Sequence, residues 1–196
     1  MSLSYRIGEV VESSSIQFTV QCYDLYKSPN IGTLVKCGDD PQLFGLVYDV
    51  SNKSMDPARR AVPRGRNENN EEGVYLSNPQ LSRLLITEIK CVSVGYKSIE
   101  GIEQSPISLP PKIHSFVLEC LDEELKEFSS SLDFLPTLLE SAILTSNDEV
   151  ISSFLLKSSK THNDASQFLI YAGKELAFNL NGQLIRLNNL LKRISK

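Results

Sequence analysis

The first 117 residues have hydrophobic positions at the two-residue spacing that is typical of β-strands. A strand with one buried face is predicted by four apolar residues that alternate with polar ones: Ile16, Phe18, Val20 and Cys22. Residues 43–50 are apolar at nearly every position, as expected of a strand that is covered on both faces. The longest strand candidate covers residues 84–96, and shorter candidates cover residues 7–12, 33–37 and 113–117. The pattern predicts an antiparallel β domain over residues 1–117.

From residue 118 onward the hydrophobic spacing changes to the steps of three and four that are typical of amphipathic α-helices. The first such stripe contains Leu118, Leu121, Leu125 and Phe128. Further helices are expected over residues 132–144, 148–156 and 164–194. The last segment contains Gly173 and Gly182, and we expect it to bend or split at these positions because glycine weakens a helix. We therefore predict an α+β protein with a C-terminal α-helical bundle over residues 118–196.

Five leucines form an apolar stripe along the last helical segment: Leu176, Leu180, Leu184, Leu187 and Leu191. A stripe of this kind packs either against the rest of the same chain or against a partner helix or second subunit. The sequence favours the seam within the chain. The five leucines remain candidate residues of a protein interface.

The long segment over residues 51–73 has no helical or strand period and little to bury. It contains four arginines, which are candidates for contacts with nucleic acid: Arg59, Arg60, Arg64 and Arg66. Long loops in compact domains are usually functional or mobile. Directly after it, the pair Asn78-Pro79 predicts a short helix over residues 79–83, since proline suits the first helical position.

The composition is that of an ordinary globular protein. The 196 residues are 41% hydrophobic and 22% charged, and the formal net charge is −4. A negative chain is not a general binder of nucleic acids or membrane surfaces, although a local basic patch stays open. The sequence has no run of about 20 apolar residues for a membrane span, and it enters a strand-like segment without an apolar signal core. We expect a cytoplasmic protein without membrane association.

Residues that carry chemistry are few and scattered. The cysteines stand singly among apolar neighbours, which favours buried, reduced thiols over a zinc site: Cys22, Cys37, Cys91 and Cys120. The only histidines are His162, expected in a solvated turn, and His114, expected in a half-buried strand or linker. The templates for a phosphate-binding loop, a dinucleotide-binding loop and a serine nucleophile elbow are absent from the sequence. The sequence predicts no enzymatic activity, no metal and no cofactor.

Several short motifs of the β half occur in a characteristic order. Residues 7–15 give a Gly-x-Val-Val opening with a polar turn, and a strand over residues 17–21 follows. Gly32 precedes the next strand, and residues 43–50 contain a Leu-x-Gly-x-Val pattern. A short helix over residues 78–85 then leads into a strand over residues 88–96.

This order resembles the HAS barrel, the N-terminal β-barrel of HerA-type DNA translocases and of F-type ATP synthase subunits. The resemblance covers about residues 5–117. It implies a small antiparallel β-barrel that helps subunits assemble and has no catalytic role. The ATPase domain that normally follows this barrel is replaced here by the helical segment, so the resemblance supports neither ATP hydrolysis nor any catalytic residue.

These observations favour a non-catalytic assembly or adaptor module that binds a protein partner or copies of itself through the barrel and the helical bundle. The alternative is a nucleic-acid-binding barrel that uses the arginines of residues 53–66. Against this alternative stand the negative net charge and the acidic residues Glu68, Glu71 and Glu72 of the same loop. An unrecognised enzyme, with a pocket between barrel and bundle, is a third hypothesis.

Overall fold

The computed structural model describes residues 5–105, 109–143 and 146–195. The strands in these ranges are β1 (Arg6–Ser13), β2 (Gln17–Cys22), β3 (Leu34–Cys37), β4 (Gln42–Ser54), β5 (Leu85–Ser98), β6 (Gly101–Glu103) and β7 (Phe116–Glu119). The helices are α1 (Glu71–Ser77), α2 (Leu81–Leu84), α3 (Asp122–Phe128), α4 (Leu135–Leu139), α5 (Asn147–Ser159), α6 (Ala165–Asn179) and α7 (Leu184–Ile194). The protein is a mixed α+β fold, as the sequence predicts.

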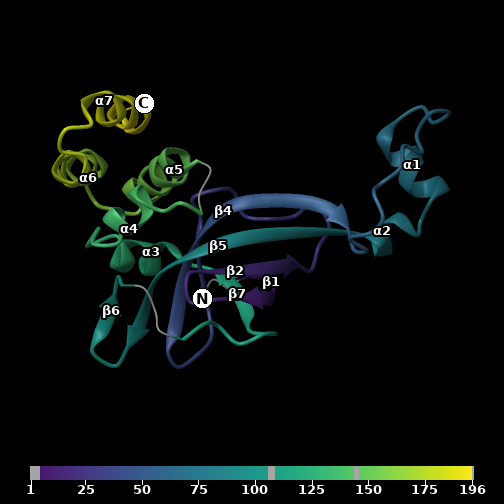
Figure 1. Cartoon of the computed structure of the whole chain (residues 1–196), viewed down its shortest axis with the longest axis horizontal. Helices are drawn as coiled ribbons and strands as arrows, with labels where there is room; N and C mark the ends of the chain where they lie inside the picture. The colour runs from purple at the N-terminus through teal and green to yellow at the C-terminus, as the bar shows by residue number, and fades with distance from the viewer. Residues whose placement is uncertain (1–4, 106–108, 144–145, 196) are drawn as a thin grey trace.

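The strands form one antiparallel sheet that closes on itself. Neighbouring strands follow the order β2-β1-β7-β3-β4-β5-β6, and β2 also pairs with β5. Residues 17–21 of β2 lie opposite residues 88–92 of β5, so six strands form a ring and β6 lies outside it (Figure 1). Shifts of register between Val10 and Glu12 and beside Gly45 mark bulges, which increase the bend and twist that closure needs.

Gly45 allows close packing inside the ring. A Cβ atom at this position would lie 2.6 Å from Cζ of Phe18 and 3.1 Å from Cβ of Cys91. Both neighbours are fully buried and cannot move away. The shift of register between Phe44 and Gly45 shows that a bulge lies at this position.

The hydrophobic residues form two clusters on opposite faces of the strands. One cluster takes residues from all six strands of the ring and fills its interior, including Val10, Phe18 and Ile89. The other lies between the outer face of β3, β4 and β5 and the helices of the second half. Leu43 and Val47 belong to the first cluster, whereas Phe44 and Leu46 belong to the second. Burial of both faces explains why residues 43–50 are apolar at nearly every position.

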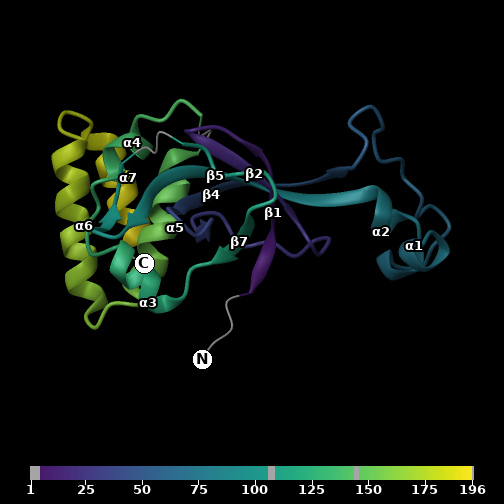
Figure 2. The ribbon, with the colours of Figure 1, turned by 90° about the horizontal axis from the view of Figure 1, so that it is seen from below.

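The helical half packs directly on the ring. Four phenylalanine rings meet at the junction: Phe44 of β4, Phe128 of α3, Phe134 at the start of α4 and Phe154 of α5. The ring centroids of Phe44 and Phe128 are 5.1 Å apart. Figure 2 shows α5 between the strands and the pair α6 and α7. Within the described ranges, no helix is both long and apolar enough to cross a membrane.

Several predicted boundaries are wrong. The irregular segment is shorter than residues 51–73, because β4 continues to Ser54 and α1 begins at Glu71. The short helix expected over residues 79–83 is α2, Leu81–Leu84. Strand β7 extends to Glu119, so the helical half begins slightly later than residue 118. In each case pairing with a distant strand or local capping sets the end of the element.

Two of the predicted helical segments of the second half contain shorter helices than expected, whereas α5, Asn147–Ser159, is longer than the predicted 148–156. The segment 132–144 contains only α4, Leu135–Leu139, and its residue 144 lies outside the described residues. The side-chain amide of Asn147 donates hydrogen bonds to the carbonyls of Leu138, Leu139 and Ser141, which satisfies the C-terminal end of α4. The segment 164–194 splits into α6 and α7 around Gly182, as expected, but α6 continues through Gly173, where no break occurs.

Candidate functional site

The candidate functional site is a two-stranded arm, formed where β4 and β5 continue beyond the ring. Residues 51–54 of β4 pair with residues 85–88 of β5, and residues 55–84 between them form the tip with α1 and α2. The tip lies at one end of the long axis of the molecule, far from α3 to α7 (Figures 1 and 2). We call residues 51–85 the arm. Residues 86–88, which pair with its first strand, are buried and are counted with the body of the protein.

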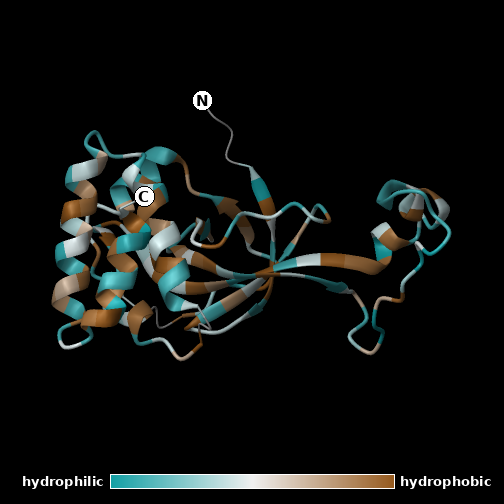
Figure 3. Ribbon diagram, turned by 90° about the horizontal axis from the view of Figure 1, so that it is seen from above, coloured by the Kyte–Doolittle hydropathy of each residue, from teal (hydrophilic) through white to brown (hydrophobic). Residues whose placement is uncertain are grey.

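The arm contributes nothing to the hydrophobic core. The structure describes every residue from 48 to 85, and none of them is buried. Four apolar side chains of the tip are strongly exposed: Met55 (54%), Val62 (69%), Leu76 (75%) and Leu84 (48%). Figure 3 accordingly shows hydrophobic segments among the hydrophilic ones of the tip. The tip helices span only seven and four residues, and isolated helices shorter than about 12–15 residues are marginal in water.

Polar contacts fix the base of the arm to the body of the protein. The backbone amide of Tyr26, in the connection between β2 and β3, donates a hydrogen bond of 2.7 Å to Oγ1 of Thr87. That hydroxyl in turn donates to Oδ1 of Asn52 across the ribbon, also at 2.7 Å. Lys53 and the nearly buried Glu88 form an ion pair of 2.5 Å. These contacts orient the arm.

A second contact holds the tip. The hydroxyls of Tyr26 and Tyr75 share a hydrogen bond, and their rings meet edge to face with centroids 6.2 Å apart. The hydrogen bond with Tyr26 raises the pKa of Tyr75 to about 12, so the hydroxyl keeps its proton at neutral pH. Sequence reasoning missed this pair because 49 residues separate the two tyrosines.

The four candidate arginines all lie in the exposed tip. Arg59 forms an ion pair of 3.2 Å with Asp56. Arg64 donates a hydrogen bond of 3.3 Å to the side chain of Asn78, which follows α1. Arg60 and Arg66 form no ion pair with another described residue. The tip therefore presents guanidinium groups to solvent beside apolar side chains.

The structure separates the leucine stripe into buried and exposed parts. Leu176 and Leu180 are buried in the cluster between ring and helices, and Leu187 and Leu191 pack against that cluster. Leu184 is 69% exposed. The proposal that Leu176 and Leu180 belong to a protein interface is therefore wrong. Both are core residues, because they pack against apolar side chains of the same chain.

The two histidines lie in surroundings other than those expected. His162 lies in the turn between α5 and α6, as expected, but its ring is half-buried because it stacks on Phe168 at 4.3 Å between centroids. Its Nε2 atom lies 2.8 Å from Oγ of the buried Ser129. The side chain of His114 is 78% exposed, and its Nδ1 atom lies 2.8 Å from Oε2 of Glu9.

A shallow cavity of about 430 Å³ lies beside His162 and is lined by Lys126, Asp164 and Tyr171. Burial, together with the positive charge of Lys126, lowers the pKa of His162. The hydrogen bond to Ser129 and the stacking on Phe168 show that His162 joins α3 to the start of α6.

The cysteine thiols are poor nucleophiles. Burial raises the pKa of Cys22 to about 11 and that of Cys37 to about 12, and it raises those of Cys91 and Cys120 further. All four are free thiols, as expected. Among the described residues, no group of three or more histidine, cysteine or carboxylate side chains is arranged to hold a metal ion.

Comparison of the sequence with models of protein families and with curated proteins gives no match.

Proposed function

We propose that this protein is a non-catalytic assembly module that binds another protein chain through its arm. The observation that carries the proposal is the arm itself, an ordered projection in which no residue is buried. Fixing a residue in one conformation costs about 1–2 kcal/mol of backbone entropy, which burial of apolar surface normally offsets. A partner that covers the tip would bury its exposed apolar side chains and so offset this entropy cost.

The composition of the tip supports a protein partner. Its basic residues are all arginines, and exposed methionine, leucine and valine side chains lie near them. Arginine and methionine are enriched at the centres of protein interfaces, whereas lysine is depleted there. Arginine also forms bidentate contacts with carboxylates, which gives specificity as well as energy.

We further propose that the closed ring of strands is a HAS-type β-barrel and that α3 to α7 form a helical bundle. The antiparallel pairing around the ring and the placement of the glycine motifs support this interpretation. In that family the barrel contributes to subunit assembly. The arm then adds a contact that extends beyond the barrel surface.

Excision of the tip tests the proposed function. Ser54 and Leu85 lie opposite each other, so an Asn-Gly turn can replace residues 55–84 and close a two-residue hairpin. Because the excised residues are not buried, we expect the shortened protein to keep the melting temperature of the full chain within about 3 °C. It should lose the self-association or partner binding that light scattering and affinity purification detect for the full chain. Unchanged association after excision refutes the proposal.

A second candidate function is nucleic-acid binding by the same tip, because the four arginines of residues 59–66 are exposed and three of them have no ion-pair partner among the described residues. This alternative predicts binding to single-stranded DNA or RNA that weakens steeply as salt is added, since released counterions drive it. No shift of a labelled oligonucleotide in a gel at low salt excludes it.

A further inference from the structure

We propose that the arm of one copy docks on an acidic face at the opposite end of a second copy, in a head-to-tail arrangement. This inference rests on the proposed function and names its partner. The acidic face is defined by five exposed carboxylates on β6, on the turn before it, on α3 and on the loop before α4: Glu100, Glu103, Asp122, Glu123 and Asp133.

The charge of the chain is divided unequally between the arm and the body. The arm has six basic and four acidic residues, a net charge of +2, so the other residues carry −6 of the total of −4. Within the arm, residues 56–66 contain four arginines and one aspartate. The arm therefore has the opposite sign to the body that carries it.

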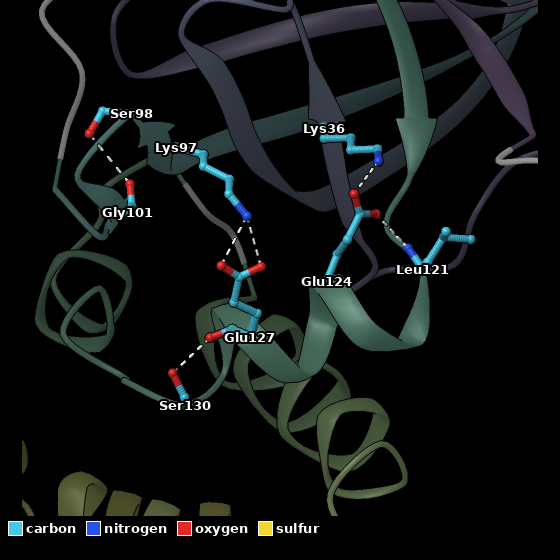
Figure 4. Close-up of polar contacts among 8 residues, drawn as sticks. All are labelled: Lys36, Lys97, Ser98, Gly101, Leu121, Glu124, Glu127 and Ser130. Carbon is cyan, nitrogen blue, oxygen red and sulfur yellow. Dashed lines mark hydrogen bonds and ion pairs between the residues drawn. The ribbon is translucent and has the colours of Figure 1, made fainter.

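The segments that carry the acidic face are held together, because the end of β5 and the residue after β6 contact the C-terminal part of α3 and the loop after it. Figure 4 shows Lys97, at the end of β5, with its ammonium group between both carboxylate oxygens of Glu127, at 2.9 Å each. The side-chain amide of Gln104, directly after β6, donates hydrogen bonds to the carbonyls of Phe128 and Ser131. These contacts fix β6 and the turn before it beside α3 and the loop that follows α3.

Two glutamates of α3 form ion pairs within the chain, and the other carboxylates of this helix belong to the acidic face. Glu124 pairs with Lys36 and caps the amide of Leu121, and Glu127 pairs with Lys97 (Figure 4). Asp122 and Glu123, in the first turn of the same helix, are exposed and form no ion pair with another described residue. Their charges are available to an external cation.

An arm cannot reach the acidic face of its own chain. Figure 1 shows α1 and α2 at one end of the long axis, whereas β6 and α3 lie toward the opposite end. Contact between arm and face therefore requires a second molecule. An interface of two different surfaces is head-to-tail, and it gives a closed ring or an open filament depending on the rotation between neighbours.

Both the arm and the acidic face also carry exposed apolar side chains, which can pack against each other. Ile99 is fully exposed in the turn next to Glu100. Met55 and Val62 are exposed on the arm beside the arginines. An apolar centre surrounded by charged pairs is the usual arrangement of a specific protein interface.

Paired charge reversals test the inference on the full chain. The arm variant carries Arg59→Glu and Arg60→Glu, and the face variant carries Asp122→Arg and Glu123→Arg. A control variant reverses two exposed lysines of α6 and α7, Lys174→Glu and Lys192→Glu. Association of each protein, and of a mixture of the arm and face variants, is measured by sedimentation velocity at low salt, where charge pairs are screened least.

We expect the arm and face variants each to associate at least about tenfold more weakly than the wild type, because like charges then face each other. The control should associate like the wild type. The mixture should recover association, since the reversed arm then meets a reversed face.

Each other outcome has a definite meaning. A wild-type protein that stays monomeric at about 100 µM overturns the inference, because a specific charged interface of this kind should form well below that concentration. If the arm variant alone loses association, or if the mixture fails to recover it, the arm binds a different surface and the inference fails while the proposed function stands. If tip excision also leaves association unchanged, both fail.

Discussion

The imidazole of His162 lies with Nε2 2.8 Å from Oγ of the buried Ser129. This contact joins the C-terminal end of α3 to the turn before α6, and the stacking of His162 on Phe168 holds the ring in place. Burial and the nearby Lys126 lower the pKa of His162, so the folded state favours the neutral imidazole.

The first prediction is a loss of stability at mildly acidic pH. The unfolded chain takes up a proton on His162 near its ordinary pKa of about 6.5, whereas the folded chain resists protonation. The contribution of His162 to the free energy of unfolding is therefore complete above about pH 6.5. It is lost as the pH falls toward the lower pKa that His162 has in the folded state. The variant His162→Gln keeps a partner for Ser129 and does not titrate, so it should show a smaller drop in the free energy of unfolding.

Denaturation in urea from about pH 5 to pH 7.5 provides the measurement, because it covers the range in which this histidine changes charge. His114→Gln removes the other histidine, which lies beside Glu9 and makes no contact with Ser129, and this variant should still show the drop that is due to His162. Equal pH profiles for wild type and His162→Gln contradict the prediction.

The second prediction compares two glycines that both have a positive φ. At Gly32 (φ 78°) a Cβ atom would lie 2.6 Å from Cβ of Ser153 and 2.7 Å from the amide nitrogen of Phe154, both in α5. At Gly182 (φ 87°) the space around the added atom is empty within 4 Å. Gly182→Ala should therefore cost only the strain of the left-handed backbone, about 1–2 kcal/mol.

Gly32→Ala should lower the free energy of unfolding by about 1–3 kcal/mol more than Gly182→Ala does. The added methyl group would force the β2–β3 connection away from α5. The free energies of unfolding in urea give the comparison. Equal costs at the two positions would show that the contact between Gly32 and α5 is not tight.

The third prediction concerns the phenylalanine cluster at the junction of ring and helices. Phe128 contacts the rings of Phe44, Phe134 and Phe154 and is 1% exposed. Phe128→Ala should lower the free energy of unfolding by about 3–5 kcal/mol, because it leaves a cavity in a tightly packed region. Phe178→Ala, at a side chain that is 81% exposed, is the control and should change stability by less than about 0.5 kcal/mol.

The fourth prediction ranks two arginines of α7 that pair with carboxylates of α5. Arg186 binds Asp148 at 2.7–2.8 Å and also donates to the carbonyl of Leu139, and both charged side chains are about 30% exposed. Arg193 pairs with Glu149 at a more exposed position. Arg186→Gln should cost about 1–2 kcal/mol, whereas Arg193→Gln should cost less than about 0.5 kcal/mol because solvent screens exposed pairs.

Thermal unfolding of the two glutamine variants, with the wild type measured in the same buffer, tests this order. A larger cost for Arg193→Gln than for Arg186→Gln would show that the contacts of Arg186 with α4 and α5 contribute little to stability.

Local patterns predicted most of the element types, but they missed the short helix α1 and the short strand β6. Residues 43–50 were expected to be covered on both faces, and Phe44 and Val47 indeed lie in different hydrophobic clusters. The split of the last helix near Gly182 was also expected. The arm was not foreseen, because its part of β4 has no buried face and so leaves no hydrophobic period in the sequence.

The amino-acid order by itself determined which segments are strands and which are helices, since period two and period 3.6 are set by neighbours along the chain. Tertiary structure alone decided the pairing of β2 with β5 that closes the ring, the contact between Tyr26 and Tyr75, and the placing of His162 against Ser129. These contacts join residues that are 33 to 75 positions apart in the chain, and they form only with the core. Their energies depend on burial and geometry that no local pattern records.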